Sequence, residues 1–110
     1  MNPRAWWRKT WGRWGPRRRL RVVTGDSLPG RLPKRDLVLA RDDDEDWCVG
    51  MLCPCGCNSP IELLVIQEAT PRWDVSVDPE GFPSLRPSVW VQTGCRSHFW
   101  LQGGRVRWCA

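Results

Sequence analysis

The sequence lacks the residue patterns on which several enzyme classes depend. Its 110 residues contain a single histidine, His98, with no glutamate beside it. Zinc-dependent deaminases need H-x-E together with P-C-x-x-C, and many zinc metalloproteases need H-E-x-x-H, so both classes are excluded. The glycine patterns of dinucleotide-binding and P-loop proteins are also missing. Any catalysis therefore has to use serine, cysteine or His98.

Long apolar runs are absent as well. No eighteen consecutive apolar residues occur, so no transmembrane helix is predicted. The first twenty residues, MNPRAWWRKTWGRWGPRRRL, carry the positive charge of a signal peptide but neither its apolar stretch nor a small-residue cleavage site. We therefore expect a cytoplasmic, reducing location, where clustered cysteines are more often metal-binding or catalytic than paired in disulfides.

The net charge of +5 is unevenly distributed. Residues 1–25 hold eight basic and no acidic residues, whereas residues 26–110 hold nine basic and twelve acidic ones. We predict a basic tail over 1–19, rich in tryptophan, followed by one domain over 20–110. Such a tail can stack on single-stranded nucleic acid or bind an anionic membrane. It can equally pack on a partner or on its own domain, or remain disordered.

Short alternating segments dominate the chain after the tail. They are rich in Val, Leu, Ile and Trp, and Gly, Pro, Asp or Asn separates them. They predict a small antiparallel all-β domain, sandwich-like and with little or no helix. The acidic run at 42–47 is expected to form an exposed turn. The expected strands are 20–23, 36–40, 47–52, 61–66, 73–77, 88–92, 98–101 and 105–108.

For one hairpin the sequence predicts which residues pair across the two strands. Gly103-Gly104 has the composition of a two-residue primed turn, which pairs Gln102 with Arg105 and each preceding residue with the matching following one. One face of the hairpin is then apolar and faces the core, with Phe99, Leu101, Val106 and Trp108. The other face carries His98, Trp100, Arg107 and Cys109, with Arg107 expected over the Trp100 indole.

The cysteines are concentrated in CPCGC, residues 53–57, and a second short element, Cys95-Arg-Ser-His98, follows downstream. Two such knuckles are typical of structural zinc, which prefers four sulfur and nitrogen ligands. In an extended strand alternate cysteines lie about 6.6 Å apart. The segment must therefore bend to bind metal. Inert thiols and a redox pair are the alternatives, and Cys48 and Cys109 are expected to be core or near-core thiols.

Several motifs resemble those of a small bacterial family called BubE. They are MLCPCGC from Met51, then Trp73, SLRPSVW, GCRSHFWL and a closing RVRW. The family pattern combines C-x-C-G-C, P-S-[I/V] and C-x-S-H-[F/Y]-x-[I/L] in that order, and the resemblance covers about residues 20–110. Genes of this family lie in operons that also encode a ubiquitin-like protein, an E1 and an E2. The resemblance therefore implies a zinc-binding serine-type peptidase that acts on the ubiquitin-like protein.

The resemblance implies roles for individual residues. It makes Ser88 the nucleophile and His98 the base, with zinc held by Cys53, Cys55, Cys57 and Cys95. Physical chemistry adds that His98 is either a zinc ligand or a base, because a metal-bound imidazole has given up its lone pair. Ser97 is the rival nucleophile, but on a strand it would point away from His98. A catalytic triad would need a third, acidic member, and the sequence leaves three candidates open: Asp74, Asp78 and Glu80.

Two functions follow from these observations. The first is a zinc-stabilised, deubiquitinase-like serine peptidase of the bacterial cytoplasm that processes or removes a ubiquitin-like protein, with that protein and its E1 and E2 machinery as partners. The second is a non-catalytic zinc ribbon that binds nucleic acid or protein through the basic tail. A scaffolding subunit of the conjugation machinery is a third. It would keep the zinc and not need Ser88.

Overall fold

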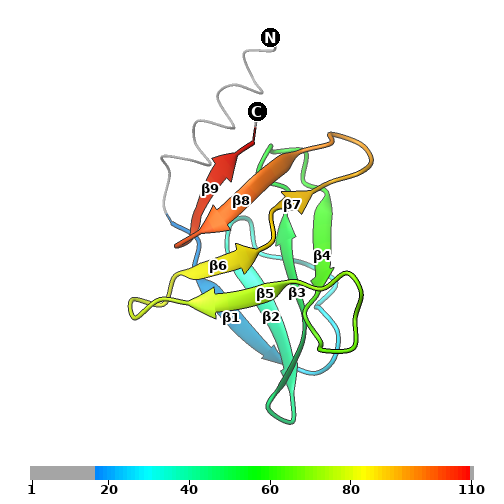
Figure 1. Ribbon diagram of the computed structural model, residues 1–110, viewed down its shortest axis with the longest axis vertical. Coiled ribbons are helices and arrows are strands. Elements are labelled where there is room, and N and C mark those ends of the chain that lie inside the picture. Colours follow the sequence, from blue (N-terminus) through cyan, green and yellow to red (C-terminus); the bar gives the residue numbers. More distant parts are fainter. Residues whose placement is uncertain (1–16, 110) are drawn as a thin grey trace.

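The computed structural model describes residues 17–109, and this part of the chain is built from strands and turns without any helix (Figure 1). The all-β prediction is confirmed. None of the described segments forms a helix that could cross a membrane. The strands are β1 (Leu20–Thr24), β2 (Leu37–Asp42), β3 (Glu45–Leu52), β4 (Pro60–Leu64), β5 (Asp74–Val77), β6 (Pro83–Arg86), β7 (Val89–Trp90), β8 (His98–Gln102) and β9 (Arg105–Trp108).

The strands form three small sheets, with the orders β1-β2-β3-β4, β5-β6 and β7-β8-β9. All neighbouring pairs are antiparallel except β1 and β2, which run parallel. The predicted antiparallel character therefore holds for these pairs with one local departure, at β1 and β2. Residues 25–36 return the chain to the start of β2, and a connection of about a dozen residues is what a parallel crossover needs.

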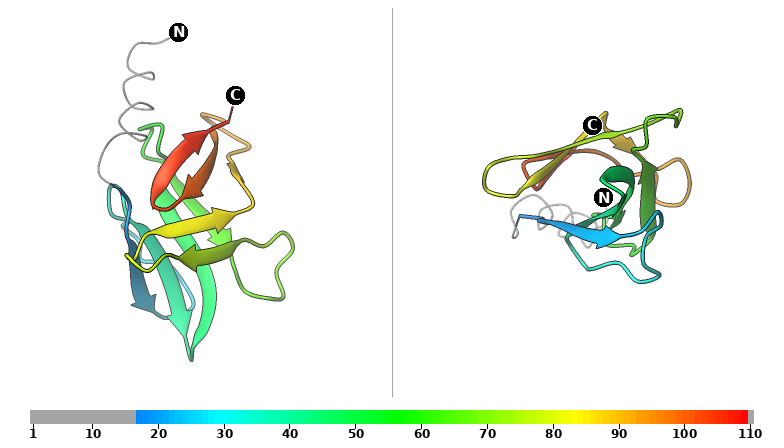
Figure 2. Two further views of the ribbon diagram at one scale, coloured as in Figure 1. Left: turned by 60° about the vertical axis from the view of Figure 1, so that its left-hand side comes forward. Right: turned by 90° about the horizontal axis from the view of Figure 1, so that it is seen from below.

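A single core lies between the large sheet and the two smaller ones. Figure 2 shows β1 and β2 on the side of the interior opposite to β5 and β6. Inward-facing residues of both layers meet there, as in two sheets packed face to face. From the large sheet come Leu37, Leu39, Val49, Met51, Ile61 and Leu63, and from the smaller sheets Leu85, Val89, Phe99, Leu101 and Val106.

The predicted hairpin has the expected register. Gln102 pairs with Arg105, Leu101 with Val106, Trp100 with Arg107 and Phe99 with Trp108. Phe99, Leu101 and Val106 of its apolar face are buried. Trp108 is partly buried and meets the Phe99 ring edge-on with centroids 5.7 Å apart. One detail differs, because Arg107 donates a hydrogen bond from Nη1 to Gln102 Oε1 at 3.0 Å instead of covering Trp100.

Two other local features bear on the prediction. Only the centre of the acidic run forms the β2–β3 turn, where Asp43 and Asp44 adopt positive φ of 50° and 62°. The rest of the run lies in strands, because β2 ends at Asp42 and β3 begins at Glu45. Strand β6 is not among the expected strands, and its sequence PSLR has a weak strand pattern that begins with a proline, which cannot donate to a sheet. Tertiary packing makes it a strand. Leu85 is 1% exposed in the core, and β6 pairs with β5.

The beginning of the described chain is anchored on the β8–β9 turn. Arg18 donates its backbone N–H to the Gly104 carbonyl at 2.8 Å, and Arg17 Nε donates to the Gly103 carbonyl at 2.9 Å. The Arg17 guanidinium also lies 3.6 Å from the centroid of the Phe82 ring. The rest of the predicted tail, and with it the expectation of nucleic-acid or membrane binding, lies outside the described residues.

Candidate functional site

The CPCGC segment leaves the end of β3 and bends sharply. Gly56 adopts a φ of 92° and Asn58 a φ of 63°, conformations that glycine and asparagine tolerate best. The bend is closed by hydrogen bonds from Gly56 N to Cys53 O at 3.2 Å and from Cys53 N to Ser59 O at 2.8 Å. The turn replaces the extended spacing that would have kept the thiols apart.

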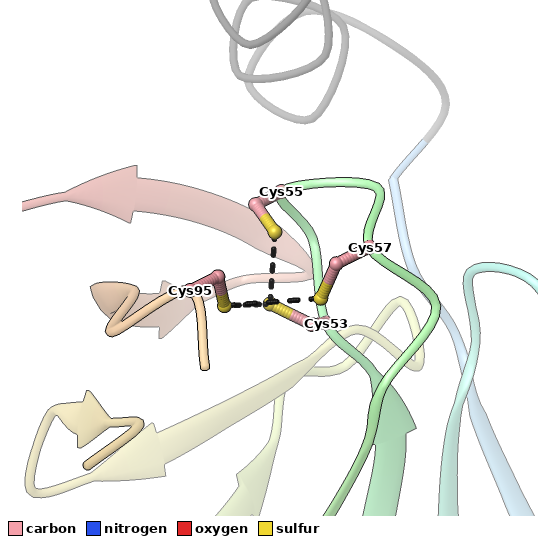
Figure 3. A group of neighbouring side chains, drawn as sticks. All are labelled: Cys53, Cys55, Cys57 and Cys95. Atoms are coloured by element: carbon pink, nitrogen blue, oxygen red, sulfur yellow. Dashed lines mark hydrogen bonds between the residues drawn. The ribbon is translucent and has the colours of Figure 1, made fainter. Parts of the chain in front are cut away.

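Four thiols converge at this turn. The Sγ atoms of Cys53, Cys55, Cys57 and Cys95 all lie within 4.8 Å of one another (Figure 3). Separations are 3.4 Å for Cys53–Cys55, 3.5 Å for Cys53–Cys95 and 3.8 Å for Cys57–Cys95. Zn–S bonds near 2.3 Å place the sulfurs of a tetrahedral site about 3.8 Å apart. The cluster therefore fits a metal ion of zinc's size and ligand preference.

The thiols of the cluster differ in their tendency to ionise. Burial raises the pKa of Cys53 and of Cys55. Burial acts in the same direction on Cys57, but hydrogen bonds from the side chain and backbone of Ser59 and from Cys55 and Cys95 outweigh it and lower the pKa of Cys57 to about 6. Because a metal bound here would require thiolates, Cys57 would be the ligand most readily available at neutral pH.

Ser97 belongs to the same cluster. Its side chain is buried, and its Oγ lies 3.5 Å from Cys53 Sγ and 3.2 Å from Cys95 Sγ. Ser97 directly precedes β8, and its side chain has other partners than that of His98. The Ser97 hydroxyl lies within hydrogen-bond distance of these two thiols and makes no hydrogen bond to the His98 side chain.

The neighbouring residue, His98, is directed to the opposite side, toward Ser88. Ser88 Oγ and His98 Nε2 are 2.9 Å apart, within hydrogen-bond distance. Ser88 directly precedes β7, which pairs with β8 so that Trp90 faces His98. The Trp73 indole donates to the Ser88 carbonyl at 3.3 Å, and the Arg86–Pro87 peptide before it is cis. This places a hydroxyl beside an imidazole, outside the cluster of four sulfurs.

Trp90 adds a feature that no sequence pattern indicated. Its indole stacks on the His98 imidazole with centroids 4.9 Å apart and an interplanar angle of 11°. The Trp90 residue is nevertheless 59% exposed. Because β7 has only two residues, sequence periodicity could not specify which side chain would lie against the histidine.

The three acidic residues considered as the third member of a catalytic triad form ion pairs with arginines. Asp74 pairs with Arg72 at 2.9 Å, whereas Asp78 and Glu80 lie 3.5 Å and 3.9 Å from Arg17. Asp78 Oδ1 also accepts backbone N–H groups from Glu80 and Phe82. Across residues 17–109 no carboxylate hydrogen-bonds to the His98 ring, so the described site is a serine–histidine pair stacked on an indole.

Comparison with known proteins identifies a family. Residues 24–109 match the model of BubE, described as a bacterial ubiquitination-like system serine protease. No curated protein and no solved structure matches. The matched range contains the four thiols, Ser88 and His98.

Proposed function

Since the chain belongs to the BubE family, we propose that it is a zinc-stabilised serine peptidase that processes or removes a bacterial ubiquitin-like protein. The observation that carries the proposal is the 2.9 Å separation of Ser88 Oγ and His98 Nε2. Its partners are that ubiquitin-like protein and the E1 and E2 that use it. All six cysteines are free thiols, which supports a bacterial cytoplasmic location.

Ser88 is the proposed nucleophile. As Oγ attacks the carbonyl carbon of the last residue of the ubiquitin-like tail, the hydroxyl proton passes to His98 Nε2. His98 then gives this proton to the leaving amine, and the tail remains as an ester on Ser88. Water attacks the ester, again losing a proton to Nε2, which restores the hydroxyl. Imidazole suits both transfers because it exchanges protons near neutral pH.

The Trp90 stack supports the orientation that these steps need. A carboxylate usually holds the imidazole of such a site, and none from the described residues does so here. The flat contact with Trp90 restricts rotation of the ring. The indole face also favours the imidazolium that forms when His98 takes the proton.

The four cysteines would hold zinc as a structural ion. Bound there, zinc would link the CPCGC turn to the segment that begins at Cys95 and leads directly into His98. The two residues between Cys95 and His98 leave little freedom, so cross-linking Cys95 also restricts where the imidazole lies. The non-catalytic ribbon with His98 as a zinc ligand is less well supported, because Nε2 faces Ser88 and the sulfurs already number four.

A covalent probe tests the nucleophile without knowledge of the substrate. We expect a fluorophosphonate to label the wild-type protein on Ser88, found by mass spectrometry of the digested protein, and to leave Ser88→Ala unlabelled. Ser97→Ala is the matched control and should still be labelled. In parallel, a ubiquitin-like protein with a C-terminal extension should be cleaved by the wild type alone. Cleavage by Ser88→Ala at the wild-type rate would remove Ser88 from the mechanism.

A further inference from the structure

We propose that the surface beside Ser88 contains a subsite for an acidic side chain of the substrate, and that Arg86 recognises its carboxylate. The inference rests on the proposed function in one respect, since it takes the bound segment to be the tail that Ser88 cleaves. It adds a substrate class, a tail with an acidic residue close to the scissile bond.

A pocket of about 530 Å³ is lined in part by residues close in the chain to Ser88 and His98. It is open to solvent and is lined by Arg72, Asp74, Arg86, Pro87, Trp100 and Gln102. Pro87 directly precedes Ser88, and Trp100 lies two residues beyond His98 on the same outward face of β8. The proposal takes a peptide positioned for attack by Ser88 to extend into this pocket, whose volume is in the range of ligand-binding pockets.

The charges around the pocket do not balance. Asp74 stands opposite Arg86 in the β5–β6 register, but its carboxylate pairs with Arg72 at 2.9 Å. Arg72 is further held by donating to the Val65 carbonyl at 3.2 Å. The Arg86 side chain is exposed, and within the described part of the chain its guanidinium makes no hydrogen bond or ion pair. The pocket thus presents one uncompensated guanidinium, which favours an anionic group.

The other residues that line the pocket restrict which side chain can bring the negative charge. Trp100, 36% exposed, and Pro87 offer apolar surface, and the Gln102 amide is held by Arg107 at 3.0 Å. An apolar stem ending in a carboxylate fits both kinds of wall. Glutamate has such a stem and aspartate a shorter one, whereas lysine and arginine would be repelled by Arg86.

The test uses short internally quenched peptides in which glutamate occupies each position in turn, compared with glutamine at the same position. We expect one position at which glutamate raises kcat/KM about 3- to 10-fold, as a partly exposed charged hydrogen bond would. Arg86→Gln should remove this preference. Arg31→Gln, which removes an equal charge from the exposed loop between β1 and β2, should keep it.

Charge reversal provides a second readout. Arg86→Glu should favour lysine over glutamate at the same position, because the sign of the pocket is then inverted. Arg86→Lys should retain a weaker glutamate preference. If no position shows a preference, or if the preference survives Arg86→Gln, the subsite is wrong.

Binding to Ser88→Ala separates this inference from the proposed function. Tight binding of the glutamate peptide that depends on Arg86, with no cleavage by the wild type, would overturn the peptidase and support the subsite. Cleavage without any glutamate preference would do the opposite. Each peptide is prepared as C-terminal amide and free acid. If only the free-acid peptides depend on Arg86 for binding or cleavage, Arg86 recognises a terminal carboxylate. The proposal that it recognises an acidic side chain would then be wrong.

Discussion

The imidazole of His98 lies flat on the indole of Trp90, with centroids 4.9 Å apart and planes inclined by 11°. The β7–β8 ladder sets this contact, since Trp90 and His98 are register partners. It leaves Nε2 free to face Ser88. Within the described residues it is the side-chain contact best placed to orient the ring.

Removing the indole should therefore affect turnover more than binding. We expect Trp90→Ala to lower kcat about tenfold, a loss that corresponds to one modest cation–π or stacking contact. KM should change little, and Trp90→Phe should recover most of kcat because a flat ring is restored. Steady-state kinetics on a cleaved peptide measure both constants. An unchanged kcat in Trp90→Ala would contradict the positioning role.

Ser97 should act on the metal and not on the substrate. Its hydroxyl lies against Cys53 and Cys95, and loss of a hydrogen bond to a ligand typically weakens metal binding about 10- to 100-fold. Competition with a chromogenic chelator should reveal this loss in Ser97→Ala. Labelling of Ser88 at saturating zinc should remain. Loss of labelling with normal zinc affinity would instead favour Ser97 as the nucleophile.

Elemental analysis of zinc distinguishes the two proposed roles of His98. The wild type and His98→Ala should bind equal amounts of zinc, because the four thiols suffice as ligands. Cys95→Ser should lose it. A strong chelator should lower the melting temperature of the wild type, since metal binding is coupled to folding. Zinc loss in His98→Ala would make the histidine a ligand and support the ribbon.

The two turn glycines should differ in their tolerance of a side chain. At Gly104, with a φ of 76°, an added Cβ would collide with the Arg18 carbonyl and lie 3.1 Å from the Phe82 ring. At Gly103 the nearest atom is the flexible Arg17 guanidinium, at 3.3 Å. We expect Gly103→Ala to cost about 1 kcal/mol and Gly104→Ala at least twice as much. Urea unfolding measures both, and equal losses would contradict the close approach of Arg18.

Much of this fold was determined by local rules that the sequence carries. Paired glycines dictate the β8–β9 register, and alternation from that turn decides that Phe99 and Leu101 are buried while His98 is not. Spacing also required CPCGC to bend if its thiols were to meet. The residues that could form the site were identifiable, although Ser88 was singled out by family resemblance.

Only the tertiary structure decided how distant segments meet. Three features depend on packing between distant segments: the parallel pairing of β1, the strand character of β6, and the stacking of Trp90 on His98. The position of Arg86 in the pocket is a fourth. Periodicity describes neighbours along the chain. It contains no information on which strand edges will pair once the chain has folded. That pairing depends on how much apolar area the whole core removes from water.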